Sequence, residues 1–266
     1  MDNAMLIVCG QATHQGLKRT DNQDAWGRFP EDGLGLSSSK GQLFIVADGM
    51  GGHAGGKEAS GMAVRLVPEA YFADPDENIA ACLERAFAAA NAQIYQRAKD
   101  SLEFHGMGTT CTVLVLKDDR VYVAHLGDSR AYRITKLKIE QLTQDHTKVA
   151  EMLRLGILTK EEALHHPEKS HLYRALGIAA TMPAEVSVSG PLRAGERYLL
   201  CTDGIGKVEL AEVKRLVLEN SPQDACDRLI KAANDRGGSD NSTVQVIEVR
   251  GAARAGAFAA LRDFFR

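Results

Sequence analysis

Residues 109–134, TTCTVLVLKDDRVYVAHLGDSRAYRI, decide the fold class of this chain. Their high content of Val, Ile, Leu and Thr predicts several β-strands in succession, joined by connections of only a few residues. Connections this short are typical of hairpins and leave no room for the crossover helices that parallel strands require. The stretch therefore predicts a largely antiparallel sheet.

Further strands and helices are expected on both sides of this stretch. Strand-like runs lie at 5–14, 42–48, 138–142, 184–188, 197–203 and 242–249. Helical periodicity covers two pairs of segments, at 55–73 and 77–103 and at 208–219 and 222–236. Runs of strands alternating with pairs of helices predict an α+β fold of packed layers.

One segment differs from its surroundings. Residues 145–182 contain short helical pieces and three histidines but no strong strand. We interpret them as a flap insertion over one end of the sheets, within a catalytic domain that covers residues 1–250. Residues 251–266 are expected to form a C-terminal amphipathic helix or a tail.

The composition limits the classes of function. The chain has 266 residues with a formal charge of −3, so it offers no general positive field for nucleic acid or anionic lipid. No apolar run approaches the roughly 20 residues of a membrane span. The five cysteines are odd in number and widely spaced, which favours a reduced, cytoplasmic protein. The small acidic excess gives no reason to expect an obligate assembly, so we expect a monomer.

Four aspartates stand at the ends of apolar strands. Asp48, Asp128 and Asp203 each lie beside a glycine at the end of such a run, and Asp240 comes just before the last strand. One Asp-Gly step alone would more simply be a turn or a helix cap, but the repetition favours a shared site. Buried carboxylates at one rim of a sheet repel each other and require a cation. Oxygen-only ligands select Mg²⁺, Mn²⁺ or Ca²⁺ over Zn²⁺.

The glycine-rich segment 49–57 matches two phosphate-binding patterns in letters only. Residues 49–54 fit GxGxxA, as in dinucleotide sites, and residues 51–57 fit GxxxxGK, as in phosphate loops. However, the next helix is followed by another helix instead of a parallel strand, and Glu58 replaces the Ser or Thr of a phosphate loop. We therefore interpret these glycines as a turn beside Asp48.

Seven short motifs follow one another along the chain. They are Arg19-x-x-Asn22-Gln23-Asp24, Asp48-Gly49-Met50-Gly51-Gly52-His53, Gly108-Thr109-Thr110, Gly127-Asp128-Ser129-Arg130, Asp145-His146, Thr202-Asp203-Gly204 and Asp240-Asn241. In this order, over about residues 10–249, they resemble the metal-dependent type 2C (PPM family) serine/threonine protein phosphatases of bacteria. The resemblance implies a four-layer αββα sandwich, in which two antiparallel sheets are flanked by helix pairs and a metal centre lies at one end.

The resemblance also implies a set of metal ligands. Two Mn²⁺ or Mg²⁺ ions would occupy the core site, where Asp48 would bridge both ions and the Gly49 carbonyl would bind one of them. Asp203 and Asp240 would hold the other ion. Asp128 would bind, together with Asp203, a third and weaker ion.

Two further residues would act on the substrate and on water. Arg19 would bind the substrate phosphate, for which a guanidinium offers paired donors, and Asp24 would order a metal-bound water. Met50 stands where many eukaryotic members carry a histidine acid, so metal-bound water would protonate the leaving group. Gln23 replaces a glutamate of many members, which would weaken binding of the second ion.

The sequence therefore predicts hydrolysis of phosphoserine and phosphothreonine in proteins by a metal-activated water, without a covalent phosphoenzyme. Its partners would be phosphorylated substrates of a serine/threonine kinase, with no nucleic acid and no membrane span. We expect His125 and Ser129 to be structural. Two alternatives stay open: a two-metal hydrolase of a non-protein phosphoester, and a non-catalytic module of the same fold that binds a partner.

Overall fold

The computed structural model describes residues 5–31, 39–51 and 53–251, without the side chain of His53. Within these ranges, no helix is both long and apolar enough to cross a membrane. The terminal helix or tail expected at 251–266 lies, apart from Gly251, outside the described residues.

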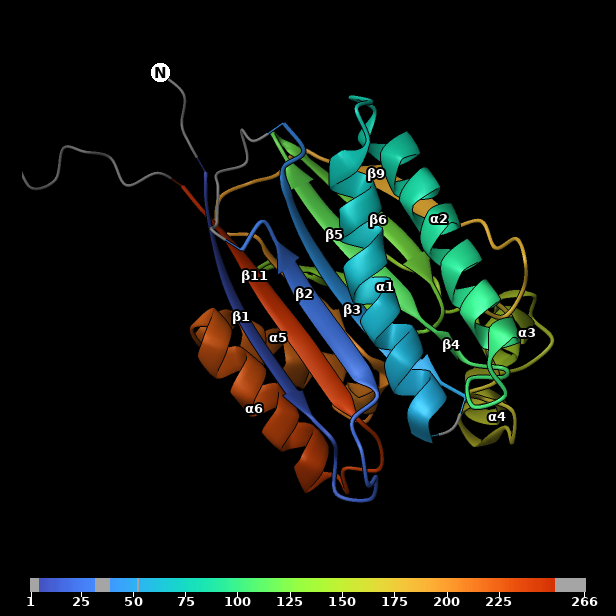
Figure 1. Cartoon of the computed structure of the whole chain (residues 1–266). Coiled ribbons are helices and arrows are strands. Elements are labelled where there is room, and N and C mark those ends of the chain that lie inside the picture. The colour runs from blue at the N-terminus through green and yellow to red at the C-terminus, as the bar shows by residue number, and fades with distance from the viewer. Residues whose placement is uncertain (1–4, 32–38, 52, 252–266) are drawn as a thin grey trace, which may run out of the picture.

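Two antiparallel sheets pack face to face (Figure 1). In strand order, the first sheet contains β1 (Leu6–His14), β11 (Ser242–Arg250), β10 (Arg197–Cys201), β7 (Arg130–Ile134) and β8 (Ile139–Gln141). The second contains β2 (Asp24–Phe29), β3 (Gln42–Met50), β5 (Cys111–Lys117), β6 (Arg120–Leu126) and β9 (Glu185–Ser189), with β4 (Gly108–Thr109) paired to the end of β3.

A pair of helices covers the outer face of each sheet (Figure 1). The second sheet is covered by α1 (His53–Ala73) and α2 (Ile79–Asp100), and the first by α5 (Leu210–Glu219) and α6 (Pro222–Asp235). Two short helices, α3 (Lys148–Arg154) and α4 (Lys160–His165), lie in the segment interpreted as a flap. The expected four-layer α+β sandwich is confirmed.

Strand alternation divides the apolar core into three layers. In β3, Leu43 and Ile45 pack against the helices, whereas Phe44 and Val46 pack between the two sheets. All four side chains are fully buried. A run that is apolar at every position is what a strand covered on both faces requires.

The sequence analysis missed β2, because it predicts no strand between the runs 5–14 and 42–48. The local pattern is weak: Asp24 and Arg28 are polar, and Gly27 has a low strand propensity. Tertiary packing overrides it, since a Cβ at Gly27 would lie 3.0 Å from the side chain of Val64 in α1. Pairing with β3 places Asp24 opposite Asp48.

Candidate metal centre

A cavity of about 380 Å³ opens at the end of the sandwich where β3 and β10 finish. Among the residues lining it are six that the sequence analysis selected: Arg19, Asp48, Gly49, Asp128, Asp203 and Asp240. The seventh, Asp24, does not line the cavity but lies behind it, beside Asp48 in the next strand. Residues distant in sequence therefore converge on one pocket.

The main chain of Asp48 is held by the neighbouring Gly-Thr-Thr segment. Its N–H donates to Thr110 Oγ1 at 2.8 Å, and its carbonyl accepts from the Thr110 N–H and from Thr109 Oγ1, both at 2.9 Å. Thr110 Oγ1 also lies 2.6 Å from the hydroxyl of Ser129, the neighbour of Asp128. Thr110 thus ties together the two strand ends that present Asp48 and Asp128.

A tight turn presents Asp128. Gly127 has φ of +109°, and a Cβ there would come within 2.6 Å of Thr110, so both the conformation and the space require glycine. Asp128 itself is only 9% exposed. Burial, reinforced by the charge of Asp203, raises the pKa of Asp128 to about 7.

The first and last parts of the chain meet at Asn241, next to Asp240. The Asn241 amide donates to the main-chain carbonyls of Gln15 and Asp21, both at 2.9 Å, and its oxygen accepts from the Gln23 N–H at 2.9 Å. These bonds fix the loop between β1 and β2, which carries Arg19, against the start of β11. They explain why an asparagine follows Asp240.

The carboxylates of the site share one electrostatic environment. Burial raises the pKa of Asp48 well above its ordinary value, and the charges of Asp24 and Asp203 add to this. Burial likewise raises the pKa of Asp203, and the charge of Asp240 adds to this. Repulsion between buried carboxylates of this kind is relieved by protons or by cations.

Asp24 is a buried part of the same group. Its Oδ2 accepts hydrogen bonds from Thr202 Oγ1 at 2.8 Å and Thr243 Oγ1 at 2.7 Å. Burial nevertheless raises its pKa to about 7, because these two bonds only partly offset the desolvation. The charges of the neighbouring Asp203 and Asp240 add to the shift.

The donor set fits a hard divalent cation. Oδ1 of Asp203 and Oδ1 of Asp24 are buried and have no hydrogen-bond partner among the described residues, and the predicted ligands offer oxygen atoms only. Within the described ranges, no three acidic, imidazole or thiol side chains already lie close enough together to hold a metal ion. Asp240 is paired instead with Arg19 at 2.7 Å, and a cation at Asp240 would replace that guanidinium.

Residues expected to be structural have structural contacts. His125 is buried, with Nδ1 2.9 Å from Thr112 Oγ1 and Nε2 3.0 Å from the Gly127 carbonyl. Ser129 is buried against Thr110. Burial also raises the pKa of the Cys201 thiol to about 12, which makes it a poor nucleophile.

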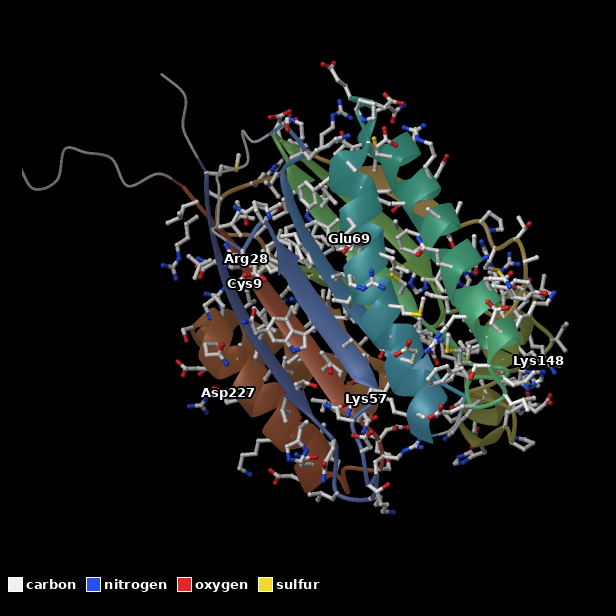
Figure 2. The ribbon with its side chains drawn as sticks, viewed as in Figure 1. Cys9, Arg28, Lys57, Glu69, Lys148 and Asp227 are labelled. Atoms are coloured by element: carbon white, nitrogen blue, oxygen red, sulfur yellow. The ribbon has the colours of Figure 1, made fainter. Side chains whose placement is uncertain are left out.

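Residues of the segment 145–182 that lie at the cavity were missed by the sequence analysis. Ser170 and Leu172 line it together with the aspartates, and both belong to residues 168–176, the returning arm of this segment, which pairs with Thr147. No local pattern marks them, and only their place in that segment could have pointed to them. At the same end of the molecule, Lys57 of α1 (Figure 2) pairs with Asp21 at 3.0 Å.

Comparison with known proteins identifies the family. Residues 14–244 match the sequence model of the family Protein phosphatase 2C. This chain belongs to the protein phosphatase 2C family. It is 36% identical over 242 residues to the serine/threonine phosphatase stp of Listeria innocua, a match that covers 89% of this chain and 93% of that protein.

Solved structures support the assignment of this chain to the protein phosphatase 2C family. The crystal structure of Stp1 from Staphylococcus aureus matches with a TM-score of 0.84 at 30% identity, covering 94% of this chain and 98% of that one. The catalytic domain of PstP in complex with 2 manganese ions matches with a TM-score of 0.79 at 30% identity, covering 92% and 99%. The predicted metal-dependent type 2C serine/threonine protein phosphatase, with relatives in bacteria, is confirmed.

Proposed function

We propose that this phosphatase hydrolyses phosphoserine and phosphothreonine in proteins with Mn²⁺ or Mg²⁺ bound in the cavity described above. Asp48 would bind two core ions, with the Gly49 carbonyl on one and Asp203 and Asp240 on the other. Asp128 would contribute to a third, weaker site. The observation that carries this proposal is the convergence of these aspartates, from distant strand ends, on one pocket.

The chemistry divides between the ions and the chain. When bound, the divalent ions lower the pKa of water and stabilise negative charge on the phosphoryl group. Arg19 has a half-exposed side chain at the cavity, and its guanidinium can donate two parallel hydrogen bonds to a phosphate. Asp24 has one oxygen occupied by two hydroxyls and one without a described partner. From its position beside Asp48 it would order a water bound to the ions.

Neither Ser129 nor Cys201 is placed for covalent catalysis. Ser129 and Cys201 are buried in the sheets, and neither is among the residues that line the cavity. Met50 does line it but has no proton to donate. We therefore assign the attack and the protonation of the leaving alkoxide to water.

We also propose that residues 145–182 act as a flap beside the protein substrate, within a catalytic domain of residues 1–250. Support comes from Ser170 and Leu172, which stand in the cavity wall. We also propose a monomer, because the small acidic excess of the chain gives no reason to expect an obligate assembly. A serine/threonine kinase would supply the substrates, and the five free thiols favour the cytoplasm.

Turnover of matched substrates tests this function. Purified protein with Mn²⁺ should hydrolyse phosphoserine and phosphothreonine peptides faster than nucleotides and sugar phosphates, and chelation should abolish the activity. A preference for nucleotides or sugar phosphates would establish another phosphoester as the substrate. Mn²⁺ binding by calorimetry without turnover of any phosphoester would instead identify a non-catalytic binding module.

A further inference from the structure

His146 lies buried where three parts of the molecule meet. It follows β8 at the start of the flap segment 145–182, two residues before α3, and only 2% of its surface is exposed. Its ring stacks on that of His125 with centroids 4.9 Å apart. It is not among the residues that line the cavity, so it does not reach a substrate there.

On one side, His146 holds both main-chain groups of Gly127. The Gly127 N–H donates to His146 Nδ1 at 3.1 Å, and the His146 N–H donates to the Gly127 carbonyl at 2.7 Å. Gly127 is the left-handed residue of the turn that presents Asp128. Any shift of His146 would therefore move the backbone that carries Asp128.

On the other side, His146 holds the returning arm of the flap. Its carbonyl accepts the Tyr173 N–H at 3.0 Å, and the next residue, Thr147, forms a β-bridge with Leu172. Leu172 lines the cavity. His146 thus contacts both the turn that presents Asp128 and the returning arm, whose Ser170 and Leu172 line the cavity.

The remaining ring nitrogen of His146, Nε2, lies near Glu185 and Arg174. Because Nδ1 accepts a hydrogen bond, the neutral ring carries its proton on Nε2, which then donates to Glu185 in β9 at 3.0 Å. Arg174 Nη1 lies 3.3 Å from the same nitrogen. Both nitrogens are engaged inside the protein, which leaves the ring no free site for acid–base catalysis.

We propose that His146 is a positioning residue that holds Asp128 and the flap in fixed relation, so that the weak third metal site and the binding of the protein substrate depend on each other. This inference rests on the proposed function. It assigns to the Asp145-His146 motif a role that its place outside the cavity does not reveal.

Two substitutions of His146 distinguish the role of Nδ1 from that of Nε2. In His146→Asn, the side-chain oxygen replaces Nδ1 as acceptor for Gly127, but the bond to Glu185 is lost. In His146→Gln, the side-chain amide reaches toward Glu185, but the acceptor for Gly127 is lost. Glu185→Ala removes the acceptor of the Nε2 proton without altering the ring, and it is informative even if a ring variant fails to fold. His105→Asn, at an exposed loop histidine, is the matched control.

The measurements are Mn²⁺ binding by calorimetry, hydrogen exchange of residues 168–176, and KM and kcat on a phosphoprotein and on an aryl phosphate. In His146→Gln, we expect the affinity of the weak Mn²⁺ class to fall about 10-fold, the lower end of the effect of lost outer-sphere partners. In His146→Asn and Glu185→Ala, we expect faster exchange of the flap arm and a higher KM for the phosphoprotein. The KM for the aryl phosphate should not change, and His105→Asn should behave as the native protein.

Two results would overturn the inference. One is a loss of thermal stability in the ring variants while Mn²⁺ affinity, flap exchange and the KM for the phosphoprotein stay native, because the role would then be purely structural. The other is an equal fall in kcat on both substrates with native Mn²⁺ binding. Failure of the proposed function looks different: the native protein would hydrolyse neither substrate, whereas calorimetry and hydrogen exchange would still report on His146.

Discussion

Two groups of aspartates in this molecule stand in opposite electrostatic conditions. At the start of α2, Arg85 binds Asp74 at 2.7 Å and Asp76 at 2.9 Å, and this guanidinium, with backbone donors, lowers the pKa of both carboxyls, that of Asp74 to about 2. At the cavity, burial raises the pKa of Asp48 and Asp128 instead, the latter to about 7.

The difference shows which carboxylates the chain compensates by itself. Arg85 neutralises the charges of both Asp74 and Asp76. By contrast, each of the guanidiniums nearest the cavity is paired with a single aspartate. Arg19 pairs with Asp240 and Arg130 pairs with Asp145. Buried carboxylates left without a matching cation are costly, and such perturbed groups mark functional sites. The cavity is therefore built to receive positive charge from outside the chain.

The largest effect is expected when one negative charge is removed from the cavity group of aspartates and, as a control, from the group near Arg85. Asp48→Asn should lower kcat/KM by at least about 1,000-fold, the scale on which loss of a principal electrostatic stabiliser acts, and Asp203→Asn should do the same. The fold should persist, because the amide preserves the shape of the carboxylate. Asp76→Asn is the matched control. Native kinetics in Asp48→Asn would remove that residue from the site.

Asp24→Asn should have an intermediate effect, because the proposal places Asp24 behind the ions instead of on them. We expect activity to fall about 10- to 100-fold, as for other outer-sphere partners of metals. Steady-state kinetics at saturating Mn²⁺ measures this, with calorimetry to show that the core ions still bind. A loss as large as that in Asp48→Asn would make Asp24 a direct ligand.

The pH dependence of the free energy of unfolding tests the raised pKa values of the buried aspartates without any mutation. A carboxyl whose pKa is higher in the folded state than in the unfolded state binds protons preferentially when folded, so stability falls as pH rises through that window. For Asp24 and Asp128, the window extends from about 4, the unfolded value, to about 7.

Thermal melts in a chelator should therefore show a midpoint several degrees lower at pH 8 than at pH 5, at about 2–4 °C per kcal/mol for a domain of this size. Mn²⁺ should restore the midpoint at pH 8 and have less effect at pH 5, where it must displace protons. A metal-free midpoint that rises steadily over this range would contradict the shifts. Buffers of equal ionic strength are the control.

The smallest effect is expected at the compensated group. Arg85→Met should leave kcat, KM and Mn²⁺ affinity within about twofold of native, because surface ion pairs contribute little. Its thermal midpoint should shift little, and that small shift should diminish in high salt as the charges are screened. A fall in activity comparable to that of Asp24→Asn would show that the two groups are coupled.

Much of the fold was predictable because its strongest signals are local. The apolar run of β3 and the successive strands from β5 to β7 required no tertiary information, and neither did the helix pairs. Errors arose where tertiary context decides. The helix expected to reach residue 103 ends at Asp100, because Ser101 takes an extended conformation and turns follow it. The strand β2 depends on packing against α1.

The residues of the site likewise divide into those that a local sequence pattern marks and those that only the tertiary structure brings to the cavity. Asp48, Asp128 and Asp203 could be selected because each ends an apolar strand, and strand ends meet at one rim. Ser170 and Leu172 could not, since their position depends on how a long loop returns to its starting point at Thr147. The pairing of Arg19 with Asp240 was equally hidden, because it joins residues 221 positions apart.

The place of β11 in the first sheet has a consequence during synthesis. This last strand lies between β1 and β10, and in the described sheet β1 pairs with no other strand. On the ribosome, β1 therefore gains its partner only after residues 242–250 have emerged. Asp240 and Asn241 arrive at that same moment, so an unfinished chain lacks both a closed sheet and a complete set of acidic groups.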